Sequence, residues 1–532
     1  RPAEGPDWLA VAGAANGAYA LDHALEEARA LALGRPAPRH RAGYAVTPLW
    51  PDPLAPGRRW VDFQNDVTAK DIALAHRENY ASVEHLKRYT TLGMGTDQGK
   101  TSNIAGLAAM ASLAEATIPD TGTTTFRPPY TPQPLELYRG SATGQDFAAP
   151  KRLVLEPRHR EAGARLRVYG GTLRPAWYGA DREASVRAEA LTARERAGIH
   201  DASPLGKIEV MGPDAAAFMD FVCYNTVSTL APGRLRYVLL LTETGTVMDD
   251  AVVARVGEHR FLLSCSSAHV DAVAAHLETW RQDGNDPDRV FVHDTTAEWA
   301  TVTVTGPAAR AIVEGLAEGA DLSSGTLPPM ALAEARFGAA PMRIARASFT
   351  GDPSFELSVP ASAATALWDA ALTGGQAHGA VPIGIEALSI LRAEKGFIMV
   401  GKDTDGETMP HDLGMAGPRA RKTAAYVGDR GLFTETACRE DRRQLVGLSV
   451  AEGEPPLPTG GHLMTPHGHR SQGFVTSSYQ SPVLGRPIAL GLLEAGRARM
   501  GEQVAVWHLG AGRAAEVVSP VFLDPDGERL HG

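Results

Sequence analysis

The 532-residue chain has little cysteine, no excess of positive charge and no long apolar segment. Its three cysteines, Cys223, Cys265 and Cys438, are far apart and form no Cys-x-x-Cys or Cys/His pattern. The sequence therefore predicts neither a disulfide framework nor a zinc or iron–sulfur site, and no bound metal is expected. Unpaired cysteines favour a reducing compartment, so we expect a cytoplasmic protein.

The charge balance argues against polyanionic partners. The formal net charge is -10 at pH 7, whereas a nucleic-acid or anionic-membrane surface needs clustered Lys and Arg. No run of 18 apolar residues is present, and acidic residues together with His23 exclude a signal segment in the Ala-rich stretch 9–33. A small molecule or another protein is the expected partner.

The length is typical of three or four domains. An apolar stretch from Trp8 leads into a turn with Gly13 and Gly17, and an Ala/Leu/Glu-rich helix follows to about Leu33. This resembles the last strand and helix of a nucleotide-binding domain, so residues 1–45 are interpreted as the C-terminal remnant of a FAD/NAD(P)-binding domain. A plain strand–helix connection is the alternative.

Residues 46–130 are expected to form a small helical segment. Thr68 followed by Asp71 is a capping-box pattern, and Ser82 can begin a second helix. The Gly-rich turn at 92–101 ends in Lys-Thr but lacks the spacing of an ATP-binding loop, so such a loop is not predicted.

A repeated pattern indicates an internal duplication in residues 184–440. Residues 207–218 read as an alternating strand, a Gly-Pro turn and the start of a helix, and residues 301–312 repeat that order. Each copy is followed by further strands and an acid, Asp250 in the first and Glu356 in the second. We expect an α+β fold with a ligand cleft shared by the two halves.

Two regions flank this duplication. Residues 131–183 are rich in Pro, Arg and Gly and are expected to be a connecting arm. Residues 441–532 have strand-like patterns, frequent turn signals and no long helical pattern, which predicts a small β-barrel domain.

Tyr237, Asp250 and Glu356 stand in strand-like apolar stretches. A carboxylate in such a place is costly unless it is hydrogen-bonded or titrates in a site. Asp249 must point to the opposite strand face from Asp250, so Asp249 is expected to be structural. Structural alternatives are a turn for the acid pair, a salt bridge or cap for Glu356 and a core position for Tyr237.

Six motifs resemble those of the aminomethyltransferase (glycine-cleavage T-protein) family of folate enzymes. They are Asp201-Ala-Ser-Pro-Leu-Gly-Lys-Ile, Thr350-Gly-Asp-Pro-Ser-Phe-Glu356, Arg392-Ala-Glu-Lys-Gly, Gly401-Lys-Asp-Thr-Asp-Gly406, Gly473-Phe-Val-Thr-Ser-Ser-Tyr-Gln-Ser-Pro482 and Pro520-Val-Phe-Leu-Asp-Pro525. The stretch 61–103, from Val61-Asp-Phe-Gln-Asn-Asp-Val-Thr onward, is similar to the alpha-subunit family of heterotetrameric sarcosine oxidases.

This resemblance implies a division of labour. A flavin-bearing beta subunit oxidises the N-methyl group of sarcosine, and the alpha subunit binds tetrahydrofolate, which captures the one-carbon unit as 5,10-methylenetetrahydrofolate. Glycine and hydrogen peroxide are the other products, and two small subunits complete the complex. Implied cofactors besides tetrahydrofolate are FMN at the interface with the beta subunit and NAD in an upstream domain.

The resemblance also assigns roles to the three strand residues. Asp250 matches the acid that faces the folate nitrogens, where a carboxylate can steer a cation and take up a proton. Glu356 matches the acid that holds the pterin through paired hydrogen bonds. Tyr237 is expected to form an aromatic wall for the pterin.

Three folate-pocket positions depart from the family pattern. Leu205 stands for a pocket methionine, Cys265 for a pocket asparagine and Leu388 for a ligand-contacting arginine. Arg392 and Glu394 share one helix and are expected to brace each other or the cleft.

The segment 91–130 is expected to contact the flavin subunit, with Lys100 and Thr101 near a flavin phosphate, because cationic and hydroxyl donors at a Gly-rich turn suit an anion. Two other functions remain open: a stand-alone glycine-cleavage aminomethyltransferase and a non-catalytic folate-binding scaffold. Co-elution of flavin-bearing partners would favour the oxidase subunit over both.

Overall fold

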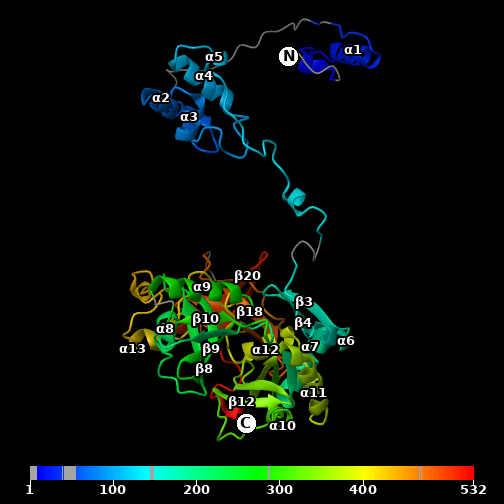
Figure 1. Ribbon diagram of the computed structural model, residues 1–532, viewed down its shortest axis with the longest axis vertical. Helices are drawn as coiled ribbons and strands as arrows, with labels where there is room; N and C mark the ends of the chain where they lie inside the picture. The colour runs from blue at the N-terminus through cyan, green and yellow to red at the C-terminus, as the bar shows by residue number, and fades with distance from the viewer. Residues whose placement is uncertain are drawn as a thin grey trace. The chain divides into compact units, whose positions relative to one another are not determined.

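The computed structural model describes residues 9–38, 40, 56–143, 149–284, 288–465, 468 and 470–531 (Figure 1). The chain divides into two compact units, residues 1–147 and 148–532. None of the helices among the described residues is long and apolar enough to cross a lipid bilayer.

The first unit begins with the short 3-10 helix η1 (Gly13–Asn16) and helix α1 (Leu21–Ala32). The helix expected there forms, but residues 9–12 have no regular structure in place of the expected strand. Trp8 and residues 41–45 lie outside the described residues. Buried Glu27 accepts hydrogen bonds from the Gly13 backbone N–H at 2.8 Å and from Asn16 Nδ2 at 3.3 Å, which ties the turn to α1.

A small helical module follows in the same unit. Its elements are β1 (Trp60–Asp62), β2 (Val67–Thr68), α2 (Ala69–Arg77), α3 (Val83–Thr90), α4 (Asn103–Leu113), α5 (Ile118–Thr121) and the 3-10 helix η2 (Leu135–Arg139). The predicted capping box of Thr68 and Asp71 opens α2, and Ser82 directly precedes α3. The core of the module includes Ile72, Leu86 and Met110, all fully buried.

The second unit starts earlier than expected. Within the supposed connecting arm 131–183, the structure places α6 (Glu156–Glu161), β3 (Ala164–Tyr169) and β4 (Thr172–Tyr178) in this unit, and β3 and β4 pair as a hairpin. Helix α7 (Arg182–Glu195) then packs on β4.

Eleven strands of the described part of this unit form one sheet, in the order β10-β6-β9-β8-β7-β12-β13-β14-β11-β5-β15. Their bounds are β5 (Gly198–Asp201), β6 (Ile208–Met211), β7 (Arg234–Leu241), β8 (Val247–Gly257), β9 (Arg260–Cys265), β10 (Phe291–Asp294), β11 (Trp299–Thr305), β12 (Ala331–Phe337), β13 (Ala340–Arg346), β14 (Ser354–Pro360) and β15 (Val381–Pro382). A single residue pair, Ala331 with Arg234, joins β12 to β7 and so links the two halves of the sheet.

The predicted duplication is visible as two equivalent connections. Strand β6 leads through Gly212 into α8 (Ala215–Val222), and β11 leads through Gly306 into α10 (Ala309–Glu314). Both glycines have positive φ, +122° and +116°, and a Cβ on either would lie within 2.4 Å of a backbone oxygen. Glycine is required at both places because no larger residue fits against the neighbouring backbone.

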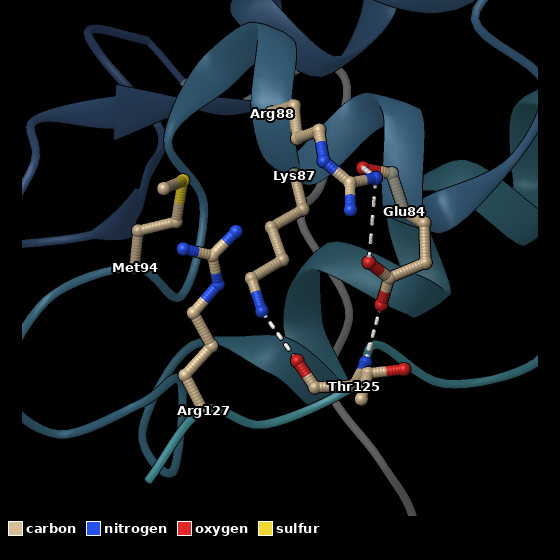
Figure 2. A pocket seen from close by; sticks show the side chains of 6 residues that line it. All are labelled: Glu84, Lys87, Arg88, Met94, Thr125 and Arg127. Carbon is tan, nitrogen blue, oxygen red and sulfur yellow. Dashed lines mark hydrogen bonds and ion pairs between the residues drawn. The ribbon is translucent and has the colours of Figure 1, made fainter.

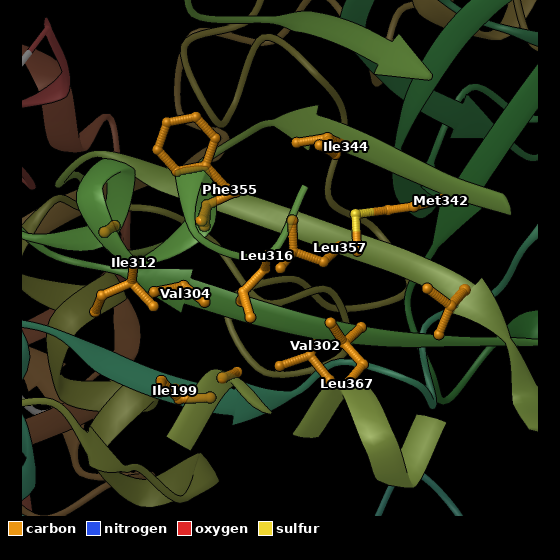
Figure 3. Packing of buried hydrophobic residues seen from close by; sticks show 14 of the residues in the cluster. Ile199, Val302, Val304, Ile312, Leu316, Met342, Ile344, Phe355, Leu357 and Leu367 are labelled. Carbon is orange, nitrogen blue, oxygen red and sulfur yellow. The ribbon is translucent and has the colours of Figure 1, made fainter. Parts of the chain in front are cut away.

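Helices cover one face of each half of the sheet. Helices α8 and α9 (Val270–Gly284) pack on the first half, and α10 and α11 (Ala364–Gln376) pack on the second. Alternate strand residues fill the layer between, among them Val302, Ile344, Phe355 and Leu357 (Figure 3). The other strand face is left to form the site, as period-two alternation requires.

The C-terminal part contains the predicted barrel. Its strands close in the order β16-β19-β18-β17-β20-β21, with bounds β16 (Arg443–Ser449), β17 (His462–Met464), β18 (Gly473–Gln480), β19 (Pro487–Glu494), β20 (Gln503–His508) and β21 (Ala511–Val518). Helices α12 (Ile385–Glu394) and α13 (Gly417–Arg421) and the 3-10 helices η4 (Ala361–Ala363), η5 (Arg430–Phe433), η6 (Gly496–Arg499) and η7 (Glu528–His531) complete the unit. The predicted fold class, a duplicated α+β domain with a C-terminal barrel and a small helical region before it, is confirmed.

Candidate functional site

A pocket of about 70 Å³ lies on the sheet face that the helices leave uncovered. It draws on both halves of the duplication, and its lining is Leu205, Lys207, Leu235, Val252, Ala254, Leu262, Ser264, Trp299, Thr301, Leu332, Arg343, Ala345, Glu356 and Ser358. The shared cleft that the repeat predicted is therefore present, and its walls are largely apolar with a few charged groups.

Glu356 on β14 is the acid of this pocket. It is paired in register with Thr303 of β11 and Ala345 of β13, and among the described residues none donates a hydrogen bond to its carboxylate. Burial raises the pKa of Glu356 to about 7, while the charge of Lys207 opposes that rise. The Glu356 carboxylate is therefore able to accept hydrogen bonds from a ligand.

Lys207 supplies a cation in the same pocket. Its Nζ donates to the backbone oxygens of Ser203 and Leu205, both at 2.8 Å. Burial lowers the pKa of Lys207 to about 8, although Asp201 and Glu356 favour its charged form. Lys207 lies in one of the six motifs that resemble the aminomethyltransferase family, but its place in the pocket follows only from the fold.

Asp250 lies further along the same strand face. Its side chain lies on the same face of β8 as those of Val252 and Ala254. Asp250 is two residues, and thus about 7 Å along the strand, from Val252 in the pocket lining. Tyr237 on β7 donates its hydroxyl to Asp250 Oδ2 at 3.0 Å. The structure therefore brings Asp250 and Tyr237 together.

Asp249 and burial set the acidity of Asp250. Burial is the larger cause and the negative charge of Asp249 the second, and together they raise the pKa of Asp250 to about 7. Asp249 points to the opposite face and is fully buried. It accepts hydrogen bonds from Ser266 N at 3.0 Å and Ser266 Oγ at 2.6 Å, and His269 Nδ1 lies 3.0 Å from its Oδ1. Asp249 is thus held by polar partners on the core face, whereas Asp250 lies on the face of the pocket and has the raised pKa.

The positions that depart from the family pattern have different surroundings. Leu205 lines the pocket. Cys265 lies in the core layer under α9, on the other face of β9 from Ser264, and its thiol has its pKa raised to about 12 by burial. Leu388 is buried on α12. Of these three residues, the structure brings only Leu205 into the pocket lining, and the folate contacts assigned to Leu205 and Cys265 remain predictions.

Arg392 and Glu394 on α12 connect parts of the unit rather than each other. Arg392 pairs with Asp403 and donates to Ser477 Oγ on β18 at 2.6 Å. Glu394 accepts from Arg194 Nη2 at 2.8 Å and Ser481 Oγ at 2.6 Å. These contacts link the barrel to the duplicated domain.

A tyrosine between two cations was not singled out from the sequence. Tyr479 on β18 accepts a hydrogen bond from Lys402 Nζ at 2.5 Å and a longer one from Arg392 Nη2 at 3.4 Å. Burial by itself would raise the pKa of Tyr479, but the charges of Arg392 and Lys402 outweigh it and lower the pKa. The motif that contains Tyr479 was recognised in the sequence, but the two cations at its hydroxyl follow only from the packing of β18 on α12.

The first unit holds a separate basic pocket of about 100 Å³ (Figure 2). Its lining is Glu84, Lys87, Arg88, Met94, Thr125 and Arg127. Lys100 and Thr101 are not part of this lining. Lys100 Nζ lies over the Tyr130 ring at 3.8 Å and donates to the Tyr130 backbone oxygen, and Thr101 Oγ1 donates to Asp97 at 2.6 Å. Their contact with a flavin phosphate stays a prediction.

No cluster of three or more His, Cys, Asp or Glu side chains suited to a metal ion occurs in the part of the chain that the structure describes.

Three family descriptions match consecutive stretches of the chain. Residues 56–141 match the sarcosine oxidase A3 domain, residues 155–418 the GCVT N-terminal domain and residues 443–524 the glycine cleavage T-protein C-terminal barrel domain.

Individual relatives agree. The chain is 38% identical over 496 residues to sarcosine oxidase subunit alpha of Rhizobium meliloti (strain 1021), which covers 91% of this chain and 50% of that protein. It is 34% identical over 377 residues to an aminomethyltransferase of Streptomyces coelicolor, covering 70% of this chain and 97% of that protein. The crystal structure of glycine cleavage system aminomethyltransferase T from Bartonella henselae superposes with a TM-score of 0.63 at 27% identity, over 71% of this chain and 99% of that one.

The chain spans about half the length of the sarcosine oxidase alpha subunits that it matches. Residue identity, domain order and fold thus lead to one conclusion: the chain belongs to the aminomethyltransferase (glycine cleavage T-protein) family and is homologous over about 90% of its length to sarcosine oxidase subunits alpha.

Proposed function

We propose that the second unit binds tetrahydrofolate with its pterin ring at Glu356 and captures on it the one-carbon unit from sarcosine oxidation, forming 5,10-methylenetetrahydrofolate. The observation that carries this proposal is the Glu356 carboxylate, which faces a pocket and has no hydrogen-bond donor among the described residues. Membership of a folate-enzyme family supports the same ligand.

The pocket chemistry suits a flat heterocycle with neighbouring N–H groups. The pterin amino group and N3–H can donate to the two Glu356 oxygens as a pair, which adds geometric specificity to a charge-assisted contact. Trp299 lies under the Arg343 guanidinium at 3.8 Å and gives the pocket a planar wall. The apolar side chains around them exclude water and strengthen each polar contact.

The capture step requires proton movement, and the proposal assigns it to Asp250. The one-carbon unit arrives as the iminium formed from the N-methyl group of sarcosine. Two folate nitrogens attack its methylene carbon in turn, two C–N bonds form, and the C–N bond to the departing amine breaks. The two protons that leave the folate nitrogens end on the departing amine. A carboxyl group with a pKa of about 7, held by Tyr237, can accept and return a proton at neutral pH.

Oxidation belongs, in this proposal, to a flavin-bearing beta subunit, with two small subunits completing a cytoplasmic complex. The relatives that are alpha subunits of sarcosine oxidase support it. FMN is proposed at the beta-subunit interface near Lys100 and Thr101, where a cation and a hydroxyl accompany a Gly-rich turn. NAD is proposed for a nucleotide-binding domain of which residues 1–45 form the end.

Stand-alone aminomethyl transfer is the second candidate, because the chain covers 97% of the Streptomyces coelicolor aminomethyltransferase. It leaves the A3 domain at residues 56–141 without a role. Purification from the native source separates the two functions, since only the oxidase subunit should elute with flavin-bearing partners.

Glu356→Gln tests the folate site in this chain alone. Loss of one charge-assisted pair should weaken tetrahydrofolate binding by about 1.5–3 kcal/mol, measured by anaerobic titration calorimetry. Glu314→Gln, on helix α10 behind the same sheet, is the matched control and should bind like the wild type. Wild-type affinity in Glu356→Gln would remove Glu356 from the folate site.

A further inference from the structure

Arg174 on β4 is a buried cation that no carboxylate of the described residues contacts directly. The residue is 8% exposed, and within the described residues its guanidinium makes one long hydrogen bond, from Nη1 to Ser267 Oγ at 3.4 Å. Within the described ranges, no carboxylate forms an ion pair with its guanidinium at 4 Å or less. Burial lowers the pKa of Arg174, partly offset by Asp201 and Tyr169.

Of the other buried arginines, two contact carboxylates, and Arg346, which follows the pocket residue Ala345, donates instead to the backbone oxygens of Leu327 at 2.8 Å, Leu530 at 3.3 Å and His531 at 3.2 Å. Arg194 contacts the carboxylates of Asp352 and Glu394, and Arg392 contacts Asp403. A guanidinium in a protein interior is costly without such a partner. Among these buried arginines Arg174 is the one with a single long hydrogen bond in the described part of the chain, which leaves its guanidinium able to bind an anionic group directly.

The position of Arg174 ties it to the loop that holds Asp249, the strand neighbour of Asp250. Its partner Ser267 directly follows Ser266, whose N–H and hydroxyl hold Asp249. The β3–β4 turn packs closely on the same loop, because a Cβ on Gly170 would lie 3.0 Å from Ala268.

Arg174 is also close to the strand row that carries Glu356. His200 on β5 is paired in register with Thr303, and Thr303 with Glu356, so the three side chains share one sheet face. The charge of Arg174 contributes to lowering the pKa of His200, after burial as the main cause. His200 Nδ1 and Thr303 Oγ1 are buried and have no hydrogen-bond partner among the described residues, so polar groups that a ligand can satisfy lie on this side too.

We propose that Arg174 and Ser267 bind the carboxylate of the amino-acid iminium that delivers the one-carbon unit, CH₂=NH⁺–CH₂–COO⁻. This inference rests on the proposed function and adds the part of the substrate that is recognised. A guanidinium binds a carboxylate through two parallel N–H···O bonds. The carboxylate of the ligand would be the direct ion-pair partner that Arg174 lacks among the described residues. The site would then select glycine-derived donors over one-carbon donors without a carboxylate.

The reverse reaction offers a test with this chain alone. The nitrogen of glycine attacks the methylene carbon of 5,10-methylenetetrahydrofolate, both folate C–N bonds break, and two protons pass from the glycine ammonium to the folate nitrogens. The products are tetrahydrofolate and the glycine iminium, which water hydrolyses to formaldehyde and glycine. Glycinamide undergoes the same chemistry without a carboxylate. Trapped formaldehyde is measured with each amine in wild type, Arg174→Gln and Ser267→Ala.

Wild type should transfer to glycine about tenfold or more faster than to glycinamide, as expected for a charge-assisted pair. Arg174→Gln should bring the glycine rate down to that of glycinamide and leave the glycinamide rate within about twofold, since only the carboxylate contact is lost. If Arg174→Gln is recovered unfolded, Ser267→Ala decides, because it should lower the preference for glycine.

The outcomes separate the two proposals. Wild type without enhanced release from either amine would overturn the proposed function. Transfer without a preference for glycine in the wild type, or an undiminished preference in the variants, would overturn the role of Arg174 and leave the capture function standing.

Discussion

At the scale of single residues, the site keeps two carboxyl groups in places that destabilise their charged form. Glu356 and Asp250 both have pKa values raised to about 7, chiefly by burial. Perturbed acids of this kind cluster where chemistry or binding needs them. The chain retains them although apolar residues would suit both strand positions, which favours function over packing as their reason.

Stability against pH provides a direct check on Glu356. Its pKa rises from 4.5 to about 7 on folding, so the folded state holds its proton more tightly than the unfolded state. The associated stability is complete below pH 4.5 and is lost as pH rises through 7, an upper bound of about 3 kcal/mol. Urea unfolding should therefore show wild type losing stability relative to Glu356→Gln between pH 5 and pH 8. A difference that stays constant over that range would contradict the burial of an unpaired carboxylate.

Strand parity favoured Asp250 over Asp249, and the family motifs selected Asp250 and Glu356; the folate roles of both residues stay predictions. Parity also shows the limit of the sequence argument. Cys265 was placed in the pocket by family position alone, whereas its strand neighbour Ser264 has the side chain on the pocket face. Lys207, Tyr479 and Arg174 could not be chosen beforehand, because the pocket and charged neighbours that distinguish them come from segments distant in the chain.

At the scale of elements, the duplication and the barrel were predictable because local signals agree with the fold. Gly212 and Gly306 mark equivalent strand–helix turns where only glycine fits. The hairpin β3–β4 was missed for a physical reason. Strand β3 alternates arginines with apolar residues on an exposed surface, and β4 contains Pro175, a residue typical of strand edges or bulges.

The Gly-rich turn of the helical module allows a prediction at this scale. Buried Asp62 accepts hydrogen bonds from Gly93 N at 2.7 Å and Ser102 Oγ at 3.4 Å, so the ends of the turn are fixed. Lys100 between them remains exposed. If the turn contacts a flavin phosphate, Lys100→Ala should reduce the flavin content or the subunit co-elution of the assembled complex. The reason is that the substitution removes a charged hydrogen bond, which contributes about 1.5–3 kcal/mol to flavin binding. Lys70→Ala, on helix α2, is the control. Unchanged flavin content and co-elution in Lys100→Ala would make the turn a purely structural segment.

At the scale of the whole molecule, the order of domains carries the functional interpretation. The A3 domain, the GCVT domain and the barrel follow one another as in the sarcosine oxidase alpha subunits, over about half of their length. The sequence motifs predicted this order. The connecting arm was shorter than expected, because residues from 149 onward belong to the second unit.

The central claim is that this chain captures a one-carbon unit that another subunit produces. The most direct measurement compares wild type, Asp250→Ala and the exposed control Asp283→Ala in the assembled complex, with peroxide, formaldehyde and methylenetetrahydrofolate assayed in parallel at saturating sarcosine and folate. A positioned proton-transfer group contributes about 100-fold or more, so Asp250→Ala should keep peroxide formation while methylenetetrahydrofolate falls and formaldehyde rises. An unchanged ratio of formaldehyde to methylenetetrahydrofolate, or an equal loss of all three products, would contradict the account.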